Sequence, residues 1–311
     1  MSEQRNILTI GTNLHGKDYV YEVVKVLGQG SFGITYLAKV CLKGALGSLQ
    51  GTIHVAIKEF YMKEMNSRSG TAVDSGKESR MFHSYREKFR KEALNLSRMN
   101  HPGIVKVLEV FDENNTSYIV MEYLTGGTLD ATIKEKSKLP EAEAMDTVSK
   151  IGLALSYMHD QRMLHLDLKP QNVMFDDAKQ PVLIDFGMSK HFEESGEPES
   201  STSIGLGTPG YAPIEQVDYT GGAEFQPTLD IYALGATLYK SLTGQTPPTA
   251  STVLNRPTLL HDRLSQAGVS EGTRNVVLKA MQPLKNARPQ TVKEFLSIME
   301  SMQQVKDSKN I

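Results

Sequence analysis

The sequence contains a single cysteine, Cys41, in 311 residues. One cysteine cannot form a disulfide within the chain, and such scarcity is typical of a reducing compartment. The formal net charge is only −2, so the chain has no general attraction for nucleic acid or anionic membranes. The best apolar run, 231–239, is short for a membrane span and contains Gly235. Residues 1–10 also lack the apolar core of a signal peptide. We therefore expect a cytoplasmic protein with no nucleic-acid partner and no membrane insertion.

The composition is that of an ordinary globular protein. Apolar side chains make up 39% of the chain and charged side chains 23%, a balance that supports a packed core. The length allows two packed units or one large domain. No segment repeats at a fixed period, so a repeat architecture is not expected.

The first part of the chain predicts mostly β-strands. Five segments are rich in β-branched and aromatic side chains: residues 19–27, 34–40, 53–60, 104–111 and 117–123. A helix is predicted at 85–100, where apolar residues recur at helical spacing. Between these elements, residues 1–18 are predicted to be an extended lead-in and 41–52 a long hairpin connection. The polar stretch 61–84 is predicted to be a mobile insertion, and a protein partner would bind there if the chain has one.

A glycine-rich turn joins the first two of these strands. Gly28, Gly30 and Gly33 fall in the run GQGSFG. Glycine lets backbone amides come close to phosphate oxygens because it has no Cβ. The dinucleotide-binding form of this pattern opens a helix, whereas this one leads into a strand. By itself the pattern fits an ordinary glycine hairpin about equally well.

Lys58 and Glu92 are the two charged residues of this part that a site could use. Lys58 ends the run VAIK, and it is either an edge lysine that points to water or a fixed positive charge facing phosphate oxygens. Glu92 lies on the apolar face of the predicted helix, between Phe89 and Leu96, where a carboxylate needs a partner or water. Lys58 is the natural candidate for that partner, although a glutamate at the margin of the face would also reach solvent.

The second part of the chain predicts helices, at 128–136, 141–161, 228–243, 275–281 and 291–303. After the second of these comes the segment His165-Leu-Asp-Leu-Lys-Pro-Gln-Asn, followed by a short predicted strand at 172–175. Pro170 prevents a helix in this segment and biases Lys169 toward an extended conformation. An acid, a base and an amide thus stand on a loop between two packed elements, which is a common setting for a functional site.

A second acid, Asp185, ends an apolar strand at 181–185 and precedes Phe-Gly. Such a run also occurs in P-loop enzymes, but the chain contains no GxxxxGK[ST], which excludes that class. Further along, the run GTPGYAPIE ends in Glu215, and Arg288 is a candidate partner for this carboxylate.

Taken in order, these motifs resemble those of the eukaryotic-like serine/threonine protein kinases, and they cover the chain from Gly28 to Arg288. The runs at 11–16 and 32–38 are similar to the bacterial branch of that family. The resemblance implies an α+β, bilobal fold, with a five-stranded antiparallel sheet and one helix in the N-lobe and a mainly helical C-lobe. The boundaries it implies are an N-terminal extension at 1–18, an N-lobe at 19–124 with the insertion 61–84, a C-lobe at 125–304 with an activation segment at 185–215, and a polar tail at 305–311.

The resemblance also implies the catalytic and metal-binding residues. Asp167 would orient the substrate hydroxyl and accept its proton, and Lys169 would neutralise the transferring phosphate. Asn172 and Asp185 would bind Mg²⁺, which prefers oxygen ligands; Mn²⁺ would also suit them.

The nucleotide that the resemblance implies is ATP. Lys58 would hold its α- and β-phosphates and would itself be positioned by Glu92. The cofactor-binding residues carried over from the family are Gly28, Gln29, Gly30, Ser31, Phe32, Gly33, Ala56, Lys58, Met121, Glu122 and Leu124.

The implied function is transfer of the γ-phosphate of Mg·ATP to Ser/Thr hydroxyls of protein substrates, with autophosphorylation as well. Lys169 and Thr208 favour Ser/Thr over Tyr as acceptors. Kinases that depend on activation-loop phosphorylation usually carry Arg directly before the catalytic Asp, but here that residue is Leu166, which cannot pair with a phosphate. We therefore expect activity not to depend strongly on phosphorylation between Ser195 and Ser203.

Two alternatives stay open at this point. One is a nucleotide-binding pseudokinase that acts as a scaffold, and the other is a small-molecule kinase on a related fold. The sequence gives no indication of the physiological substrate or the oligomeric state.

Overall fold

The computed structural model describes residues 6–30, 33–41, 53–63, 65–76, 79–186, 190–191, 207–219 and 225–308. The chain divides into two compact units, each with its own core. Unit 1 comprises residues 1–100 and 105–123, and unit 2 comprises residues 101–104 and 124–311.

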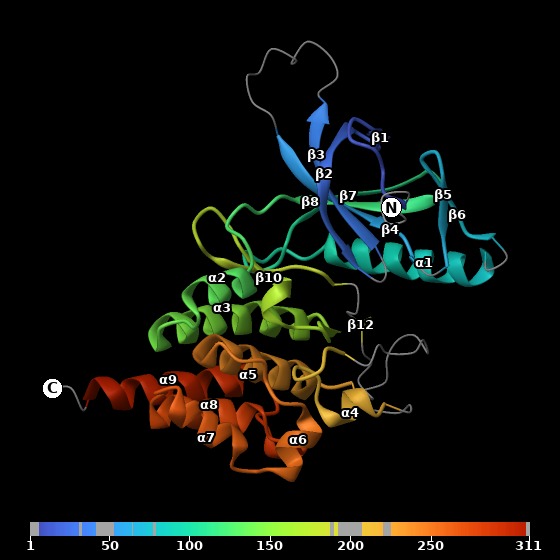
Figure 1. Ribbon diagram of the computed structural model, residues 1–311. Helices are drawn as coiled ribbons and strands as arrows, with labels where there is room; N and C mark the ends of the chain where they lie inside the picture. The colour runs from blue at the N-terminus through green and yellow to red at the C-terminus, as the bar shows by residue number, and fades with distance from the viewer. Residues whose placement is uncertain are drawn as a thin grey trace. The chain divides into compact units, whose positions relative to one another are not determined.

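An antiparallel sheet forms the centre of unit 1 (Figure 1). Its strands lie in the order β1-β2-β3-β4-β8-β7. Their bounds are Asn13–His15 for β1, Val20–Gly30 for β2, Gly33–Cys41 for β3, His54–Phe60 for β4, Val107–Glu113 for β7 and Thr116–Glu122 for β8. The turn between β7 and β8 has positive φ at Asn114 and Asn115, a conformation that asparagine tolerates and that suits a tight hairpin. The five strands predicted from the sequence are confirmed.

The sheet has a sixth strand that the sequence did not predict. β1 lies in the predicted lead-in, and its Leu14 pairs with Tyr21 of β2. Leu14 is fully buried, whereas its two neighbours in the strand are exposed. Three residues are too few to show the two-residue periodicity by which a strand is recognised. The predicted count of five strands is therefore wrong by this one short strand.

The polar stretch predicted to be a mobile insertion contains a hairpin and the start of a helix. The hairpin consists of β5 (Ser67–Ser69) and β6 (Ala72–Asp74). Helix α1 spans Ser79–Leu96, so it begins and ends earlier than the predicted 85–100. The rings of Phe82 and Phe89 lie 5.2 and 5.3 Å from the ring of Phe60 on β4, and these contacts fix α1 against the sheet. Most residues near the start of α1 are polar, so the apolar periodicity that predicts a helix is not visible there. The predicted hairpin connection at 41–52 lies almost wholly outside the described residues.

Unit 2 is mainly helical. Its helices are α2 (Leu129–Lys136), α3 (Glu141–Asp160), α4 (Ile214–Val217), α5 (Thr228–Thr243), α6 (Ala250–Asn255), α7 (Leu259–Gln266), α8 (Glu271–Ala280) and α9 (Val292–Ser308), with 3₁₀ turns at Pro170–Asn172 and Lys285–Ala287. α5 is buried along nearly its whole length and contacts α3, α7 and α8, so it forms the centre of this unit. Its predicted bounds are confirmed.

Short strands complete unit 2. β9 (Met163–Leu164) pairs with β12 (Lys190–His191), and β10 (Val173–Phe175) pairs with β11 (Pro181–Leu183). α4, α6 and α7 were not predicted, because each is too short to show helical periodicity. α9 continues through Ser308, five residues beyond the predicted end of this helix at 303 and into the predicted polar tail.

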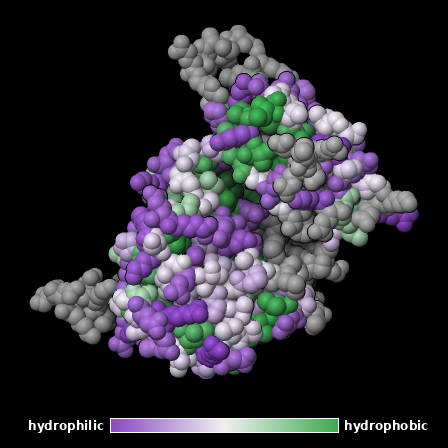
Figure 2. All heavy atoms as spheres, viewed as in Figure 1, coloured by the Kyte–Doolittle hydropathy of each residue, from purple (hydrophilic) through white to green (hydrophobic). Residues whose placement is uncertain are grey.

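Figure 2 shows apolar side chains gathered over the strands of unit 1 on the visible face, whereas the visible surface of unit 2 is mostly hydrophilic or neutral. In the part of the chain that the structure describes, no helix is both long and apolar enough to cross a membrane.

Candidate active site

The loop that carries Asp167 is irregular, as Pro170 requires. Pro170 opens a single 3₁₀ turn, and Lys169 before it is extended, with φ −161° and ψ 163°. Leu166 has a φ of +66°, in the left-handed region of backbone conformation that residues other than glycine and asparagine seldom adopt. A strained backbone of this kind persists only where its surroundings hold it in place.

Asp230, near the start of α5, is what holds this loop. Its carboxylate accepts the backbone N–H groups of His165 at 2.9 Å and Leu166 at 2.8 Å, and it also contacts Nε2 of His159 at 2.8 Å. Burial raises the pKa of the Asp230 carboxyl, but the interactions with His159 and His165 lower it by more, so the pKa lies below its ordinary value. Asp230 falls in the helix predicted at 228–243, but nothing in the sequence pattern indicated this function.

The Asp167 carboxylate is the centre of a hydrogen-bonded cluster in unit 2. Lys169 Nζ donates to its Oδ2 at 2.7 Å, and Thr208 Oγ1 donates to its Oδ1 at 2.6 Å. Lys169 Nζ also lies 2.9 Å from Thr208 Oγ1, which closes a triangle of three side chains. Asn172 Nδ2 donates to the Asp167 carbonyl at 2.8 Å and to Oδ2 at 3.1 Å. These contacts fix an acid, a cation and a hydroxyl within reach of one reacting group.

Asn172 and Asp185 fit a hard metal ion. The N–H of Ile184 donates to the carbonyl of Asn172 at 2.9 Å, which brings the end of β11 beside this loop. Because the Asn172 amide nitrogen faces Asp167, its Oδ1 is directed away from that residue. An amide oxygen and a carboxylate, completed by phosphate oxygens and waters, form a ligand set that suits Mg²⁺. Among the described residues, no three His, Cys, Asp or Glu side chains come together to hold a metal by themselves.

In unit 1 the glycine turn and Lys58 share one row of the sheet. Gly28 pairs with Thr35 of β3, and Thr35 pairs with Lys58 of β4. Ala56 and Lys58 lie two residues apart on β4 and so face the same side of the sheet. The next strand places Met121 opposite Ala56. The structure thus brings together three of the segments that the resemblance assigns to the nucleotide: the glycine turn, β4 and β8.

The glycines of the turn are not all explained by packing within the chain. A Cβ on Gly33 would come 2.7 Å from the carbonyl oxygen of Glu59, so this glycine is required by the adjacent strand. A Cβ on Gly28 would meet no described atom within 4 Å, and one on Gly30 would meet only the Gly33 carbonyl at 3.9 Å. Their bare backbones leave room for a group from outside the chain, as phosphate binding requires. Ser31 and Phe32 lie outside the described residues.

The other assigned residues are placed on their elements as follows. Glu122 ends β8 and its carboxylate accepts the N–H of Lys106 at 2.7 Å, while Gln29 pairs with Ile34 across the glycine turn. Leu124 is buried in unit 2, and Glu92 lies on α1 of unit 1. The predicted pairing of Lys58 with Glu92 stays a prediction.

The last residue of the predicted activation segment, Glu215, is anchored by a buried ion pair. Arg288 contacts Glu215 through two bonds of 2.6 and 3.1 Å, and its side chain is fully buried. The guanidinium also donates to the carbonyls of Gln282, Pro283 and Thr228. The predicted partnership of Glu215 and Arg288 is confirmed.

Leu166 is buried in a small apolar cluster. Its neighbours there are Leu164, Phe225 and Leu229, with Tyr219 against them. Nothing in the sequence pattern indicated this cluster, since its two groups of members are more than fifty residues apart along the chain.

Residues 21–309 match the family model described as the protein kinase domain. The serine/threonine-protein kinase PknA of Nostoc sp. is 29% identical over 91% of this chain and 47% of its own length. PknB of Mycobacterium tuberculosis, also a serine/threonine-protein kinase, is 30% identical over 88% of this chain and 41% of its own length. Aurora/IPL1-related protein kinase 2 of Caenorhabditis elegans is 29% identical over 73% of this chain and 64% of its own length. The chain therefore spans less than half the length of the two bacterial relatives. The family match, which extends over both units, shows that the chain belongs to the protein kinase family.

Proposed function

We propose that this domain is a serine/threonine kinase that transfers the γ-phosphate of Mg·ATP to Ser/Thr hydroxyls of proteins, its own included. The observation that carries the proposal is the triangle of Asp167, Lys169 and Thr208. It places a proton acceptor beside a fixed ammonium group, as transfer from a phosphoanhydride to a hydroxyl requires.

The residues of the triangle have separate tasks in this reaction. Asp167 orients the acceptor hydroxyl and takes its proton, and the hydroxyl of Thr208 holds the carboxylate in one rotamer. Lys169 offsets the negative charge that spreads over the transferring phosphoryl oxygens, an electrostatic contribution that is often the largest in catalysis. A bound Mg²⁺, held by Asn172 and Asp185, would supply further positive charge to the phosphates. Lys58 and the bare backbone of the glycine turn would bind the rest of the triphosphate.

Three further statements belong to the proposal. The domain boundaries stay as assigned from the resemblance, at 19–124 and 125–304. The substrates are proteins, and no nucleic-acid partner is assigned because the net charge is only −2. A cytoplasmic location is proposed for this domain because it has a single cysteine, which is typical of proteins in a reducing compartment.

The direct test is transfer of labelled γ-phosphate from Mg·ATP to the protein itself and to a generic basic protein. We expect label on phosphoserine and phosphothreonine, complete loss of label with EDTA, and recovery with added Mg²⁺ or Mn²⁺. Nucleotide binding without any transfer would instead identify a pseudokinase. Label confined to a panel of small metabolites would identify a small-molecule kinase.

Activity is expected to be independent of phosphorylation in the activation segment. Leu166 carries no charge, and none of the described residues in the cluster around it is a cation that could pair with a phosphate. Replacing Ser195, Ser200, Ser201, Thr202 and Ser203 together by alanine should change the transfer rate by less than about threefold, since no arginine pairing is lost. Phosphatase-treated wild-type protein serves as the control. Loss of substrate phosphorylation in the alanine variant would refute this independence.

A further inference from the structure

Gln216 is a buried polar side chain that has no task in the reaction described so far. It lies on α4 and is only 4% exposed. Its side-chain Nε2 donates to the carbonyl oxygen of Leu166 at 2.7 Å, although the two residues are 50 positions apart in the sequence. Leu166 directly precedes Asp167, the proposed proton acceptor. A side chain just beyond the predicted activation segment therefore reaches the backbone next to the reacting carboxylate.

The bond from Gln216 fixes the peptide unit that joins Leu166 to Asp167. The N–H of this unit, which belongs to Asp167, contacts His165 Nδ1 at a long 3.4 Å, so the carbonyl has the shorter hydrogen bond. Rotation of the unit would turn the Asp167 side chain away from the acceptor hydroxyl. Leu166 also has the strained φ of +66°, and such a backbone persists only where its surroundings hold it.

Leu166 is held from two sides, with different consequences. Asp230 of α5 accepts the N–H of Leu166 at 2.8 Å, whereas Gln216 donates to its carbonyl. The first contact fixes the peptide unit before Leu166, and the second fixes the unit after it, which is attached to Asp167. Because the Leu166 side chain packs in the apolar cluster, both contacts involve its backbone.

The position of Gln216 is itself fixed by its neighbour. Glu215 forms the buried ion pair with Arg288, at 2.6 Å. The backbone N–H of Gln216 also donates to the carbonyl of Pro213 at 3.1 Å, which closes the first turn of α4. The Gln216 amide is therefore in place before any substrate binds, as a group that supports a reacting residue must be.

The same amide lies against the residue that precedes Thr208. Gly207 has a φ of +66°, and a Cβ there would come 2.8 Å from Gln216 Nε2 and 2.6 Å from the Cβ of Ala212. A larger residue at this position would push the Gln216 amide away. Because Thr208 donates to Asp167 at 2.6 Å, Gln216 contacts the chain directly before each member of this hydrogen-bonded pair.

We propose that Gln216 is a positioning residue for phosphate transfer, whose amide sets the orientation of Asp167 and its distance from Thr208. The inference rests on the proposed function, because it needs Asp167 to be the proton acceptor. Gln216 acts through Asp167 and does not touch the substrate. It connects the end of the predicted activation segment to the catalytic loop through a neutral hydrogen bond, which needs no phosphate and no arginine before Asp167.

The first test is Gln216→Leu, which nearly keeps the volume of the side chain and removes the donor. We expect the transfer rate at saturating ATP to fall by about 10- to 100-fold, the effect of a small misplacement of a reacting group. The affinity for ATP should be unchanged. Gln282→Leu is the matched control, because Gln282 also donates to a backbone carbonyl of unit 2, that of Leu278 at 3.1 Å. This control should transfer phosphate at the wild-type rate.

A double-mutant cycle separates positioning from a general loss of structure. If Gln216 acts through Asp167, adding Gln216→Leu to Asp167→Asn should lower the residual rate by less than about twofold. A merely structural effect would lower the rate by the same factor in both backgrounds, and that result would overturn the proposal.

Gln216→Glu gives an independent readout through pH. An ionised carboxylate cannot donate to the Leu166 carbonyl, whereas a protonated carboxyl can. Burial raises the pKa of the introduced carboxyl, so the rate of this variant relative to the wild type should rise as the pH is lowered. The relative rate of Gln216→Leu should stay constant over the same range. A constant ratio for Gln216→Glu as well would contradict the role of the donated hydrogen bond.

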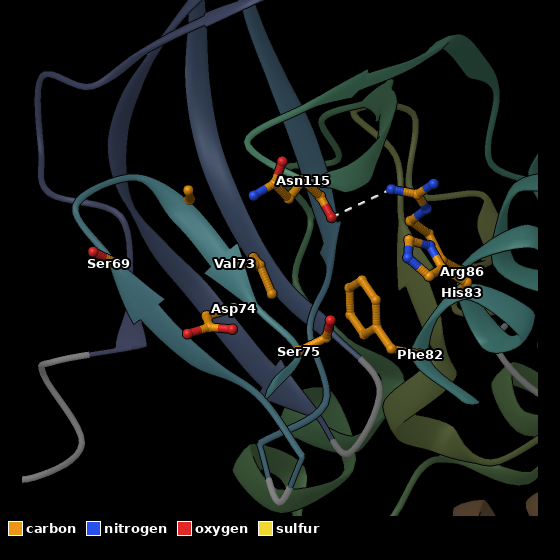
Figure 3. A pocket seen from close by; sticks show the side chains of 9 residues that line it. Ser69, Val73, Asp74, Ser75, Phe82, His83, Arg86 and Asn115 are labelled. Carbon is orange, nitrogen blue, oxygen red and sulfur yellow. Dashed lines mark hydrogen bonds between the residues drawn. The ribbon is translucent and has the colours of Figure 1, made fainter. Parts of the chain in front are cut away.

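Hydrogen exchange without ATP distinguishes this inference from the proposed function. Gln216→Leu should speed exchange at Leu166 and Asp167. The β5–β6 hairpin is the internal reference, because it belongs to unit 1, where Figure 3 shows it beside Phe82 of α1. Unchanged exchange at the loop, together with normal transfer by the wild type, would refute the inference alone. No transfer by the wild type, together with faster exchange in the variant, would refute the proposed function.

Discussion

Asp167→Asn is expected to lower the rate of phosphate transfer by about 10²- to 10⁴-fold, the usual contribution of a positioned general base. An amide has nearly the shape of a carboxylate but cannot take a proton from the acceptor hydroxyl. ATP binding should be little changed, because the residues that we assign to the nucleotide are left intact.

The variant is expected to fold, because its hydrogen bonds can be kept. The amide oxygen can continue to accept from Lys169 and Asn172, on the side where Oδ2 now lies. The amide nitrogen then faces Thr208, whose hydroxyl can turn and accept instead of donating. The lower rate would therefore reflect the missing proton acceptor and not a change in the conformation of the loop.

The rate should be measured with labelled γ-phosphate under single-turnover conditions, with ATP affinity measured separately. Asp160→Asn is the control, since Asp160 is an exposed acid of the same unit, 58% accessible and paired with Lys293. Transfer at the wild-type rate by Asp167→Asn would mean that the catalytic assignment is wrong. Label in a mock preparation made without this protein would instead indicate a contaminating kinase.

Arg68→Met is expected to destabilise unit 1 by about 3–5 kcal/mol, the cost of leaving one partner of a buried ion pair alone. Arg68 and Glu59 are 2% and 0% exposed, and their 2.5 Å contact lies under the β5–β6 hairpin. Glu59 also accepts from the hydroxyls of Tyr36 at 2.9 Å and Tyr118 at 2.8 Å. Burial and the negative charge of Glu59 raise the pKa of both tyrosines, so they stay protonated donors.

Arg68 also joins two peripheral segments to the sheet. It donates to the carbonyl of Asn6 at 3.0 Å and to that of Thr71 at 2.7 Å, and it lies over the ring of Tyr61. Methionine fills a similar volume but offers none of these donors. We therefore expect both the N-terminal segment and the hairpin to open in the variant.

Hydrogen exchange of β4 peptides measures this effect within unit 1 alone. A loss of 3–5 kcal/mol corresponds to exchange that is faster by about 10²- to 4 × 10³-fold, at 1.4 kcal/mol for each factor of ten. Adding Glu59→Gln should restore part of the protection, because the amide removes the buried charge. Its oxygen still accepts from one tyrosine, and the other tyrosine hydroxyl can turn and accept from the amide nitrogen. Arg90→Met, which breaks an ion pair with 43% and 40% exposed partners, should cost about 0–1 kcal/mol. If the β4 amides of Arg68→Met exchanged no faster than those of Arg90→Met, the Arg68–Glu59 ion pair would not contribute to the stability of unit 1.

The sequence by itself determined the order of the main elements and the chemistry of the site. Five strands and the helix at 228–243 were predictable because each is long enough to show its periodicity. The candidate catalytic segment could be picked out because its acid, lysine and asparagine lie within a few residues of each other. Pro170 also fixed the loop locally, through its own ring and its effect on Lys169.

Only the tertiary structure decided which distant residues meet. Asp230 holds the backbone of a loop more than sixty residues away, at His165 and Leu166. Thr208, in the predicted activation segment, reaches Asp167 across about forty residues. Neither contact leaves a periodic trace in the sequence.

The same holds for the hairpin and the short helices, whose stability comes from packing and buried polar contacts rather than from local pattern. Arg68, in a polar stretch that predicted no structure, is placed by its contact with Glu59. The periodic spacing of apolar residues determines those helices and strands that are long enough to present one apolar face. Long-range contacts, which depend on where the chain returns in space, fix the rest.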